Sequence, residues 1–150
     1  MTAGQRWWVL AATVLALTLA VMVPRRRTEP AIAAATDESV LVTAYCNCAK
    51  CCGYVTNAEG TAFFTSGPLA GRPKRIGQTA SGRMAHLGTL ASDWKVFPPA
   101  TRLFVPGYGT GVVEDTGRAV SGRHIDVWMP THDEARRWGA RRLEVRRLGP

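Results

Sequence analysis

Residues 111–128 read GVVEDTGRAVSGRHIDVW and contain two short apolar runs, the first followed by an aspartate and the second containing one. The runs 111–114 and 124–128 are rich in β-branched residues, and the turn-forming segment 117–122 separates them, so they predict two strands. Asp115 follows the first run and Asp126 lies inside the second. Because an ionised carboxylate in an apolar strand is costly unless it is partnered, both aspartates are candidates for a functional site.

Working outward, further short runs of strand-forming residues flank this stretch on both sides. The final segment alternates apolar and charged residues, as a strand with one buried face does. The turn at 106–109 links two of the runs. The predicted strands are residues 40–45, 88–91, 101–105 and 141–146.

One helix is expected at residues 131–138, because Thr131 can cap its first turn, Asp133 and Glu134 suit the helix dipole there, and Gly139 ends it. Residues 57–78 hold too many glycines and prolines for a regular element and predict a long binding loop. At least six short strands with one helix indicate an all-β fold, a small six-stranded closed barrel.

The N-terminal run 7–23 is uncharged and apolar, which predicts a transmembrane or signal helix over residues 1–23. This segment is either an uncleaved anchor or a cleaved signal peptide. A cytoplasmic orientation of the domain is a third alternative, because three arginines follow the run. Residues 24–38 read as a linker and residues 39–150 as the domain. We expect a monomer in the cell envelope, tethered outside the cytoplasm or secreted.

The net charge is +8, which suits nucleic acid, anionic lipid or an anionic wall polymer as a partner. An exported domain meets only the last two, so no nucleic-acid partner is expected.

All four cysteines lie in one segment, Cys46-Asn-Cys48-Ala-Lys-Cys51-Cys52. Outside the cytoplasm an even number of cysteines suggests disulfides, whereas Cys48 and Cys51 have the spacing of metal ligands. Redox-active or free thiols are the third alternative. No cofactor is expected, apart from zinc at this segment. The histidines His86, His124 and His132 carry no motif and are predicted to have surface or turn roles.

A third aspartate, Asp93, follows the predicted strand 88–91. The alternative to a functional role is that each aspartate caps a turn or pairs with a nearby arginine, such as Arg83, Arg118 or Arg123.

The sequence resembles the three-aspartate (3D) domain shared by membrane-bound lytic transglycosylase A and small bacterial cell-wall proteins. The resemblance covers nearly all of residues 40–148 and implies a double-psi β-barrel in which the three aspartates converge in a groove. It rests on Val42-Thr-Ala-Tyr-Cys46, Gly77-Gln-Thr-Ala-Ser-Gly82, Leu90-Ala-Ser-Asp93, Pro106-Gly-Tyr-Gly109, Glu114-Asp-Thr-Gly117, Gly122, Ile125-Asp-Val-Trp128, Glu134-Ala and Trp138-Gly139.

The resemblance implies an enzyme that cleaves the bond between N-acetylmuramic acid and N-acetylglucosamine in peptidoglycan and leaves 1,6-anhydro ends. In this reading Asp126 is the general acid and base, and Asp115 and Asp93 are the carboxylates that set its environment. Close carboxylates cannot all be ionised cheaply, so one of them should keep a proton near neutrality. The alternatives are a non-catalytic wall-binding module and a redox or metal module built on the cysteines.

Second-tier candidates for binding sugar are polar residues beside the aspartates: Thr79, Ser81, Lys95 and Thr116. Trp94 and Trp128 are candidates for stacking on sugar rings, although core packing is the commoner role. The sequence departs from the family pattern at Trp94, where a proline is usual, and at Ala100 and Arg118, where glycines are usual. Arg118 could lower the pKa of Asp115 or hold an anionic stem peptide.

Overall fold

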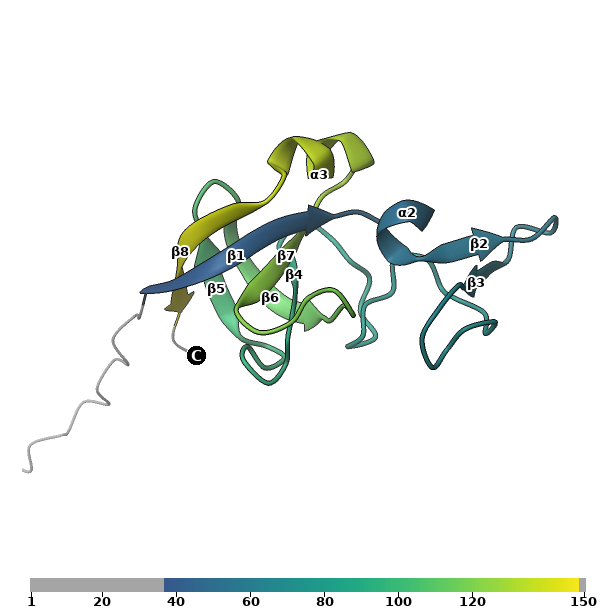
Figure 1. Ribbon diagram of the computed structural model, residues 1–150, viewed down its shortest axis with the longest axis horizontal. Coiled ribbons are helices and arrows are strands. Elements are labelled where there is room, and N and C mark those ends of the chain that lie inside the picture. Colours follow the sequence, from purple (N-terminus) through teal and green to yellow (C-terminus); the bar gives the residue numbers. More distant parts are fainter. Residues whose placement is uncertain (1–36, 149–150) are drawn as a thin grey trace, which may run out of the picture. The chain divides into compact units, whose positions relative to one another are not determined.

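The computed structural model describes residues 37–148, which belong to one compact unit (Figure 1). The expected helix at residues 1–23 and nearly all of the expected linker lie outside the described residues. Within 37–148, no helix has the length and apolar character needed to cross a membrane.

Six strands close into a barrel in the order β1-β7-β4-β6-β5-β8. The pairs β1–β7 and β4–β6 are parallel, and the other pairs around the barrel are antiparallel. This pairing confirms the predicted six-stranded barrel and is consistent with its double-psi form. The strands are β1 (Asp37–Tyr45), β4 (Thr89–Ser92), β5 (Arg102–Val105), β6 (Gly109–Asp115), β7 (His124–Trp128) and β8 (Arg141–Leu148).

The barrel interior is filled by apolar side chains that alternate along the strands. In β7, for example, Ile125 and Val127 are fully buried while Asp126 between them is part-exposed. All four residues of β4 are buried, whereas burial alternates along β5 and β7. The core is Val40, Val42, Leu90, Phe97, Leu103, Val105, Val113, Ile125, Val127, Trp138 and Val145.

The close approach of β4 and β6 requires a glycine at position 111. A Cβ atom there would lie 2.7 Å from the Gly88 carbonyl oxygen and 2.7 Å from Cγ of Leu90, which is closer than real contacts allow. Gly111 therefore lets β6 pair closely with β4. This pairing places Asp115, at the end of β6, opposite Ala91 of β4.

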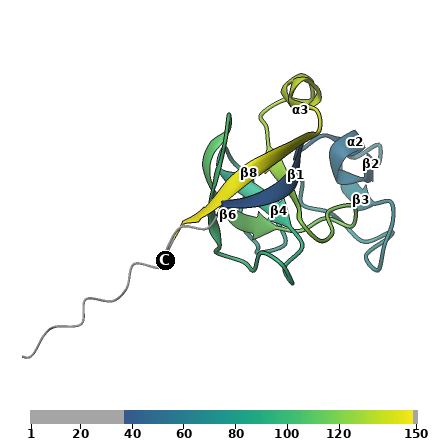
Figure 2. The ribbon, with the colours of Figure 1, turned by 60° about the vertical axis from the view of Figure 1, so that its left-hand side comes forward.

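The predicted helix is α3 (His132–Trp138), which packs near β1 over one side of the barrel (Figure 2). Thr131 caps it as expected. The Thr131 hydroxyl accepts a hydrogen bond from the Glu134 backbone, and the Glu134 side chain accepts one from the Thr131 backbone. This reciprocal cap fixes the first turn of α3 and the direction of its first residue, His132.

A single-turn helix, α2 (Ala49–Cys52), and a hairpin of β2 (Tyr54–Thr56) and β3 (Ala62–Phe64) lie outside the barrel, beyond the end of β1 (Figures 1 and 2). The prediction that residues 57–78 hold no regular element is wrong at β3. Three-residue strands carry too little periodicity to be seen in the sequence, and β3 is stabilised by pairing with β2.

Candidate active site

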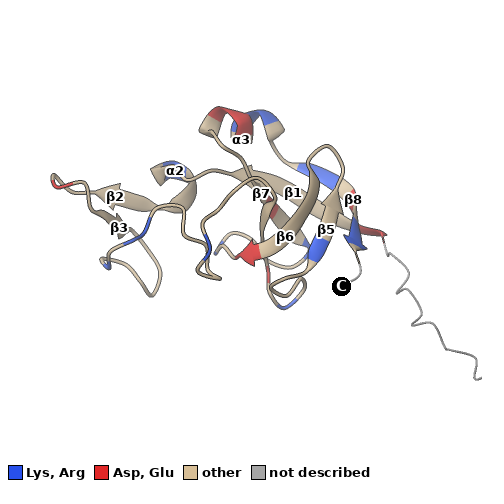
Figure 3. Ribbon diagram, turned by 180° about the vertical axis from the view of Figure 1, so that it is seen from behind, with Lys and Arg blue, Asp and Glu red and all other residues tan. Residues whose placement is uncertain are grey.

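Strand β4 places Asp115 and Asp126 on either side of one small residue. Ala91 is paired with Asp126 on β7 and with Asp115 on β6. The register between β4 and β6 shifts at Leu90/Ala91, so that β6 has one extra residue, Glu114, at this point. A bulge of this kind redirects the side chains that follow it. It brings Asp115 beside Ala91 at the acidic C-terminal end of β6 (Figure 3).

Asp126 is part-buried and belongs to a short hydrogen-bonded chain. The Thr43 hydroxyl donates to Oδ1 of Asp126 over 2.8 Å, and Nε2 of His124 lies 2.8 Å from the same hydroxyl. Burial raises the pKa of Asp126 above the usual carboxyl value, and the charge of Asp115 adds to this, while Thr43 and His124 oppose it. The surroundings of Asp126 therefore favour its protonated form more than those of an ordinary carboxyl group do.

Asp115 is held in a fixed orientation by three donors. Its Oδ1 accepts hydrogen bonds from the backbone of Ala80 (2.8 Å) and Thr116 (2.9 Å), and its Oδ2 accepts one from the Tyr45 hydroxyl (3.0 Å). Burial and the neighbouring Asp115 raise the pKa of Tyr45, so this phenol remains a donor. In addition, the indole of Trp94 donates to the Asp115 carbonyl over 3.0 Å.

Both aspartates line a groove of about 570 Å³. Its walls come from the end of β1, from the segment 47–53, from the loop 64–78 and from the loop 115–120. A volume of this size is typical of ligand pockets, which usually measure about 300–1,000 Å³. The groove is also lined by two cationic side chains, Lys74 and Arg118.

Asp93 is not among the residues that line this groove. Its Oδ2 accepts a hydrogen bond from the Gly122 backbone (2.9 Å) and its Oδ1 accepts one from the Lys95 backbone (3.0 Å). These two bonds lower the pKa of Asp93. The carboxylate thus ties the turn after β4 to the loop that leads into β7, the strand that carries Asp126.

The second-tier candidates for binding sugar also differ in whether they line the groove. Thr116 lines the groove, whereas Thr79, Ser81 and Lys95 do not. The Thr79 hydroxyl lies 3.1 Å from both the Ser81 hydroxyl and the Arg83 carbonyl, which is a turn-stabilising arrangement. The geometry of this turn matters to the site because it presents the Ala80 backbone to Asp115.

The two tryptophans considered for sugar stacking act instead as hydrogen-bond donors beside the groove. Trp94 bonds the backbone of Asp115, and Nε1 of Trp128 donates to Oδ1 of Asn47 over 2.9 Å. Neither tryptophan lines the groove, and the aromatic residues that do are Tyr45 and Phe64.

Arg118 lines the groove and does not pair with Asp115. Its guanidinium donates to the Ser66 hydroxyl, and it forms no salt bridge with any carboxylate among residues 37–148. This geometry therefore does not support the sequence-based hypothesis that Arg118 lowers the pKa of Asp115.

Sequence reasoning missed three residues that support the site. Thr43 lies 83 residues from Asp126 in the sequence and reaches it only through the pairing of β1 with β7, whereas His124 lies on β7 itself and contacts the Thr43 hydroxyl. Glu114 was treated only as part of a motif. It is buried, pairs with Arg83 over 2.8 Å and accepts a hydrogen bond from Thr89 over 2.9 Å, so it anchors the bulge before Asp115.

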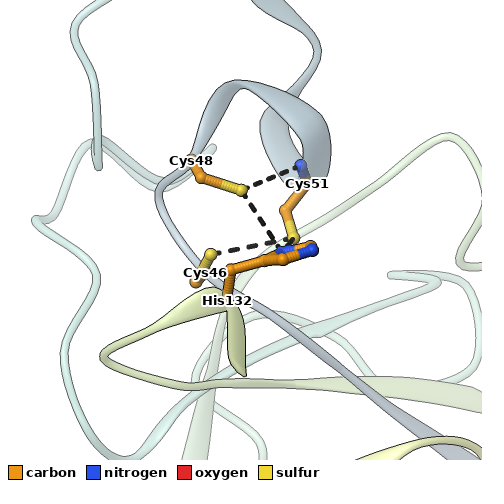
Figure 4. Close-up of side chains that lie close together, drawn as sticks. All are labelled: Cys46, Cys48, Cys51 and His132. Carbon is orange, nitrogen blue, oxygen red and sulfur yellow. Dashed lines mark hydrogen bonds between the residues drawn. The ribbon is translucent and has the colours of Figure 1, made fainter. Parts of the chain in front are cut away.

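The four cysteines are unpaired thiols in the structure. Cys46, Cys48 and Cys51 face the ring of His132 from α3 (Figure 4), and one atom of each of these four residues lies within 4.8 Å of all the others. Cys52 is outside this group, because its thiol donates to the Cys46 carbonyl. The expected surface or turn role of His132 did not anticipate this arrangement.

Residues 88–148 match the family model described as the 3D domain. This part of the chain is therefore similar to a 3D domain. All three aspartates lie within the matched residues, which include every barrel strand except β1.

Two curated relatives from Bacillus subtilis (strain 168) are each 34% identical over 76 residues, which is 48% of this chain. They are the cell wall-binding protein YocH and the putative cell wall shaping protein YabE. The matched part is only 26% of YocH and 19% of YabE, so this chain spans about a quarter and about a fifth of their lengths.

Solved structures of MltA from Escherichia coli also resemble part of the chain. One crystal structure is 23% identical with a TM-score of 0.40, over 51% of this chain and 29% of MltA. The complex of MltA with bound chitohexaose is 20% identical with a TM-score of 0.41, over 53% of this chain and 30% of MltA.

Proposed function

We propose that this protein is a peptidoglycan lytic transglycosylase, with Asp126 as its general acid and base. The observation that carries the proposal is the position of Asp126, a carboxyl group with a raised pKa that lines an open groove beside Asp115. The 3D domain and its relatives named for cell-wall binding and shaping support peptidoglycan as the polymer.

The proposed reaction needs one proton donor that later becomes the acceptor. Protonated Asp126 gives its proton to the oxygen between N-acetylmuramic acid and N-acetylglucosamine, and the bond from that oxygen to the muramyl C1 breaks. The muramyl 6-hydroxyl then attacks C1, and the Asp126 carboxylate takes up the hydroxyl proton. The anhydro bond replaces the glycosidic bond, no water is consumed, and Asp126 ends in its starting form.

Asp115 has a separate role in this scheme. Its carboxylate keeps a fixed position through Tyr45 and two backbone donors, and its charge stabilises the positive charge that develops at C1. The same charge raises the pKa of Asp126, so the two carboxylates act as a coupled pair. Asp93 supports them indirectly by fixing the loop before β7.

The remaining features of the groove suit a glycan strand that bears acidic peptides. Lys74 and Arg118 place positive charge in the groove, and Thr116 offers a hydroxyl group next to Asp115. The substrate would reach the groove outside the cytoplasmic membrane, where the N-terminal segment would serve as an anchor or signal. We expect the protein to act there as a monomer.

The test is to digest purified sacculi with the full chain and to analyse the soluble products by mass spectrometry. Release of muropeptides with 1,6-anhydro ends, without incorporation of ¹⁸O from labelled water, is the expected result. Reducing ends labelled with ¹⁸O would identify a hydrolase. Binding to sacculi without any release would contradict the catalytic proposal.

The second candidate is a wall-binding module without turnover, which the name of YocH favours. It predicts that the full chain sediments with sacculi without releasing muropeptides, and that Asp126→Asn does not change the bound fraction. The transglycosylase proposal predicts unchanged binding but loss of anhydro products in this variant.

A further inference from the structure

Three thiols and one imidazole converge from two segments that are far apart in the sequence. The Cys46 and Cys51 sulfurs lie 3.7 Å apart, and Nδ1 of His132 lies 3.5 Å from the Cys48 sulfur and 3.4 Å from the Cys51 sulfur (Figure 4). Cys46, Cys48 and Cys51 follow β1, whereas His132 begins α3. Structural zinc sites commonly draw their ligands from two segments in this way.

The distances agree with those between neighbouring ligands of a tetrahedral zinc ion. With zinc–sulfur bonds of about 2.3 Å and zinc–nitrogen bonds of about 2.05 Å, tetrahedral geometry puts two sulfurs about 3.8 Å apart and a sulfur and a nitrogen about 3.6 Å apart. The observed separations of 3.7, 3.5 and 3.4 Å differ little from these values. A disulfide, in contrast, requires sulfurs about 2.05 Å apart.

Local structure holds the ligands in this arrangement. Cys48 is the N-cap of α2, and its sulfur accepts a hydrogen bond from the Cys51 backbone over 3.4 Å. Gly53 ends α2 in the left-handed conformation, with φ of 55°. On the other side, the reciprocal cap of Thr131 and Glu134 fixes the start of α3. Hydrogen bonds of this kind orient metal ligands and are typical of zinc sites.

We propose that Cys46, Cys48, Cys51 and His132 bind one zinc ion in a closed, four-coordinate structural site. Cys52 does not take part, because its thiol is directed to the Cys46 carbonyl over 3.1 Å. The site does not depend on the proposed chemistry of the aspartates, and it would bind zinc in a protein that only recognises the wall.

A zinc ion at this site would also affect the groove, through the residue between two of its ligands. Asn47 lies between two of the ligands, accepts a hydrogen bond from Trp128 at the end of β7 and, through its carbonyl, another from Tyr54 at the start of the hairpin. Asn47, Cys51 and Gly53 all line the groove. Zinc would therefore connect α3 to the segment 46–54 and fix one wall of the groove relative to the barrel.

The direct test uses the full chain, purified under reducing conditions and stripped of metal with a chelator. Titration with Co²⁺ should give the intense d–d absorption of a tetrahedral site together with thiolate-to-cobalt charge transfer, saturating at about one equivalent. Zn²⁺ should displace the cobalt at about one equivalent, and should raise the melting temperature.

Matched variants identify the ligands. Cys48→Ser and His132→Gln should each weaken Zn²⁺ binding at least about tenfold and alter the cobalt spectrum. Cys52→Ser, which changes the adjacent cysteine, and His86→Gln, which changes an exposed histidine, should bind Zn²⁺ like the parent chain.

Three results would overturn the proposal. The first is a reduced parent chain that gives no tetrahedral cobalt spectrum, and this result does not depend on whether any variant folds. The second is equal loss of Zn²⁺ binding in Cys52→Ser and Cys48→Ser. The third is purification of the chain from the cell envelope with Cys46, Cys48 or Cys51 in stable disulfides and without zinc.

Discussion

Thr43 and Asp126 lie opposite each other in the parallel pair of β1 and β7, and the Thr43 hydroxyl donates a 2.8 Å hydrogen bond to Oδ1 of Asp126. A hydroxyl group has one proton, so His124, whose Nε2 lies 2.8 Å from the same oxygen, acts as the donor to Thr43. The chain from His124 through Thr43 orients the carboxyl group and moderates the rise in its pKa.

Thr43→Val should therefore shift the pH dependence of glycan cleavage. Loss of the hydroxyl removes a bond that favours the ionised carboxylate, so the pKa of Asp126 rises further. Because the acid must be protonated to react, the alkaline limb of the pH–rate profile should move up by about one pH unit. Thr43→Ser, which keeps the hydroxyl, should leave the limb in place. A downward shift in Thr43→Val would contradict this account.

Asp126→Asn should make the folded protein more stable at neutral pH. The folded pKa of Asp126 lies above its unfolded value, so the native state binds more protons between the two values, and stability falls as the pH rises through that interval. Asparagine avoids this cost and can still accept the Thr43 hydrogen bond. In chemical denaturation the gain should be present at pH 7 and should disappear as the pH falls toward about 4. A gain independent of pH would contradict the pKa argument.

Asp93→Asn should show the opposite pH dependence. The folded pKa of Asp93 lies below its unfolded value, so its stabilising contribution is present above the unfolded pKa and is lost as the pH falls through the folded one. The variant should melt at a lower temperature than the parent chain at pH 7, and the difference should shrink in acid. Glu59→Gln, at an exposed turn, is the control and should have no such effect.

The same Asp93 variant distinguishes a positioning role from a catalytic one. A residue that only holds the loop before β7 should change the rate without moving the pH optimum of cleavage. An optimum that moves with Asp93→Asn would instead make Asp93 a member of the titrating group.

Ala100→Gly should stabilise the protein by about 0.5 to 1 kcal/mol, because the left-handed conformation costs alanine more than glycine gains in unfolded-state entropy. Ala100 has φ of 67° and is the only non-glycine residue with a positive φ in the described part of the chain. The matched control is Ala140→Gly, at an exposed position with ordinary φ, which should give no gain. Denaturant unfolding of both variants checks the prediction, and equal effects would contradict it.

Much of the fold could be predicted from the sequence, because the strands of the barrel are bounded by turn residues and α3 has its capping residues in order. The bulge at Leu90/Ala91 could not be predicted, since it arises from the pairing of two strands and not from either one alone. The hairpin was missed for a related reason, as β3 forms only by pairing with β2.

Prediction of the candidate site was limited in the same way, by contacts between segments that are distant in the sequence. Asp115 and Asp126 could be selected by their apolar surroundings, which are local in sequence. The sequence places Asp93 equally well, but its hydrogen bond to Gly122 depends on a loop contact across the fold. Likewise, His132 lies more than 80 residues from Cys51, so no spacing rule could have joined it to the cysteines.

The most direct test of the central claim compares the full chain with its Asp126→Asn variant on purified sacculi. We expect the parent chain to release 1,6-anhydro muropeptides, and the variant to bind sacculi equally while its rate of release falls by about 10²- to 10⁴-fold. Asp126→Asn releasing these products at nearly the parent rate would contradict the assignment of Asp126 as the acid and base.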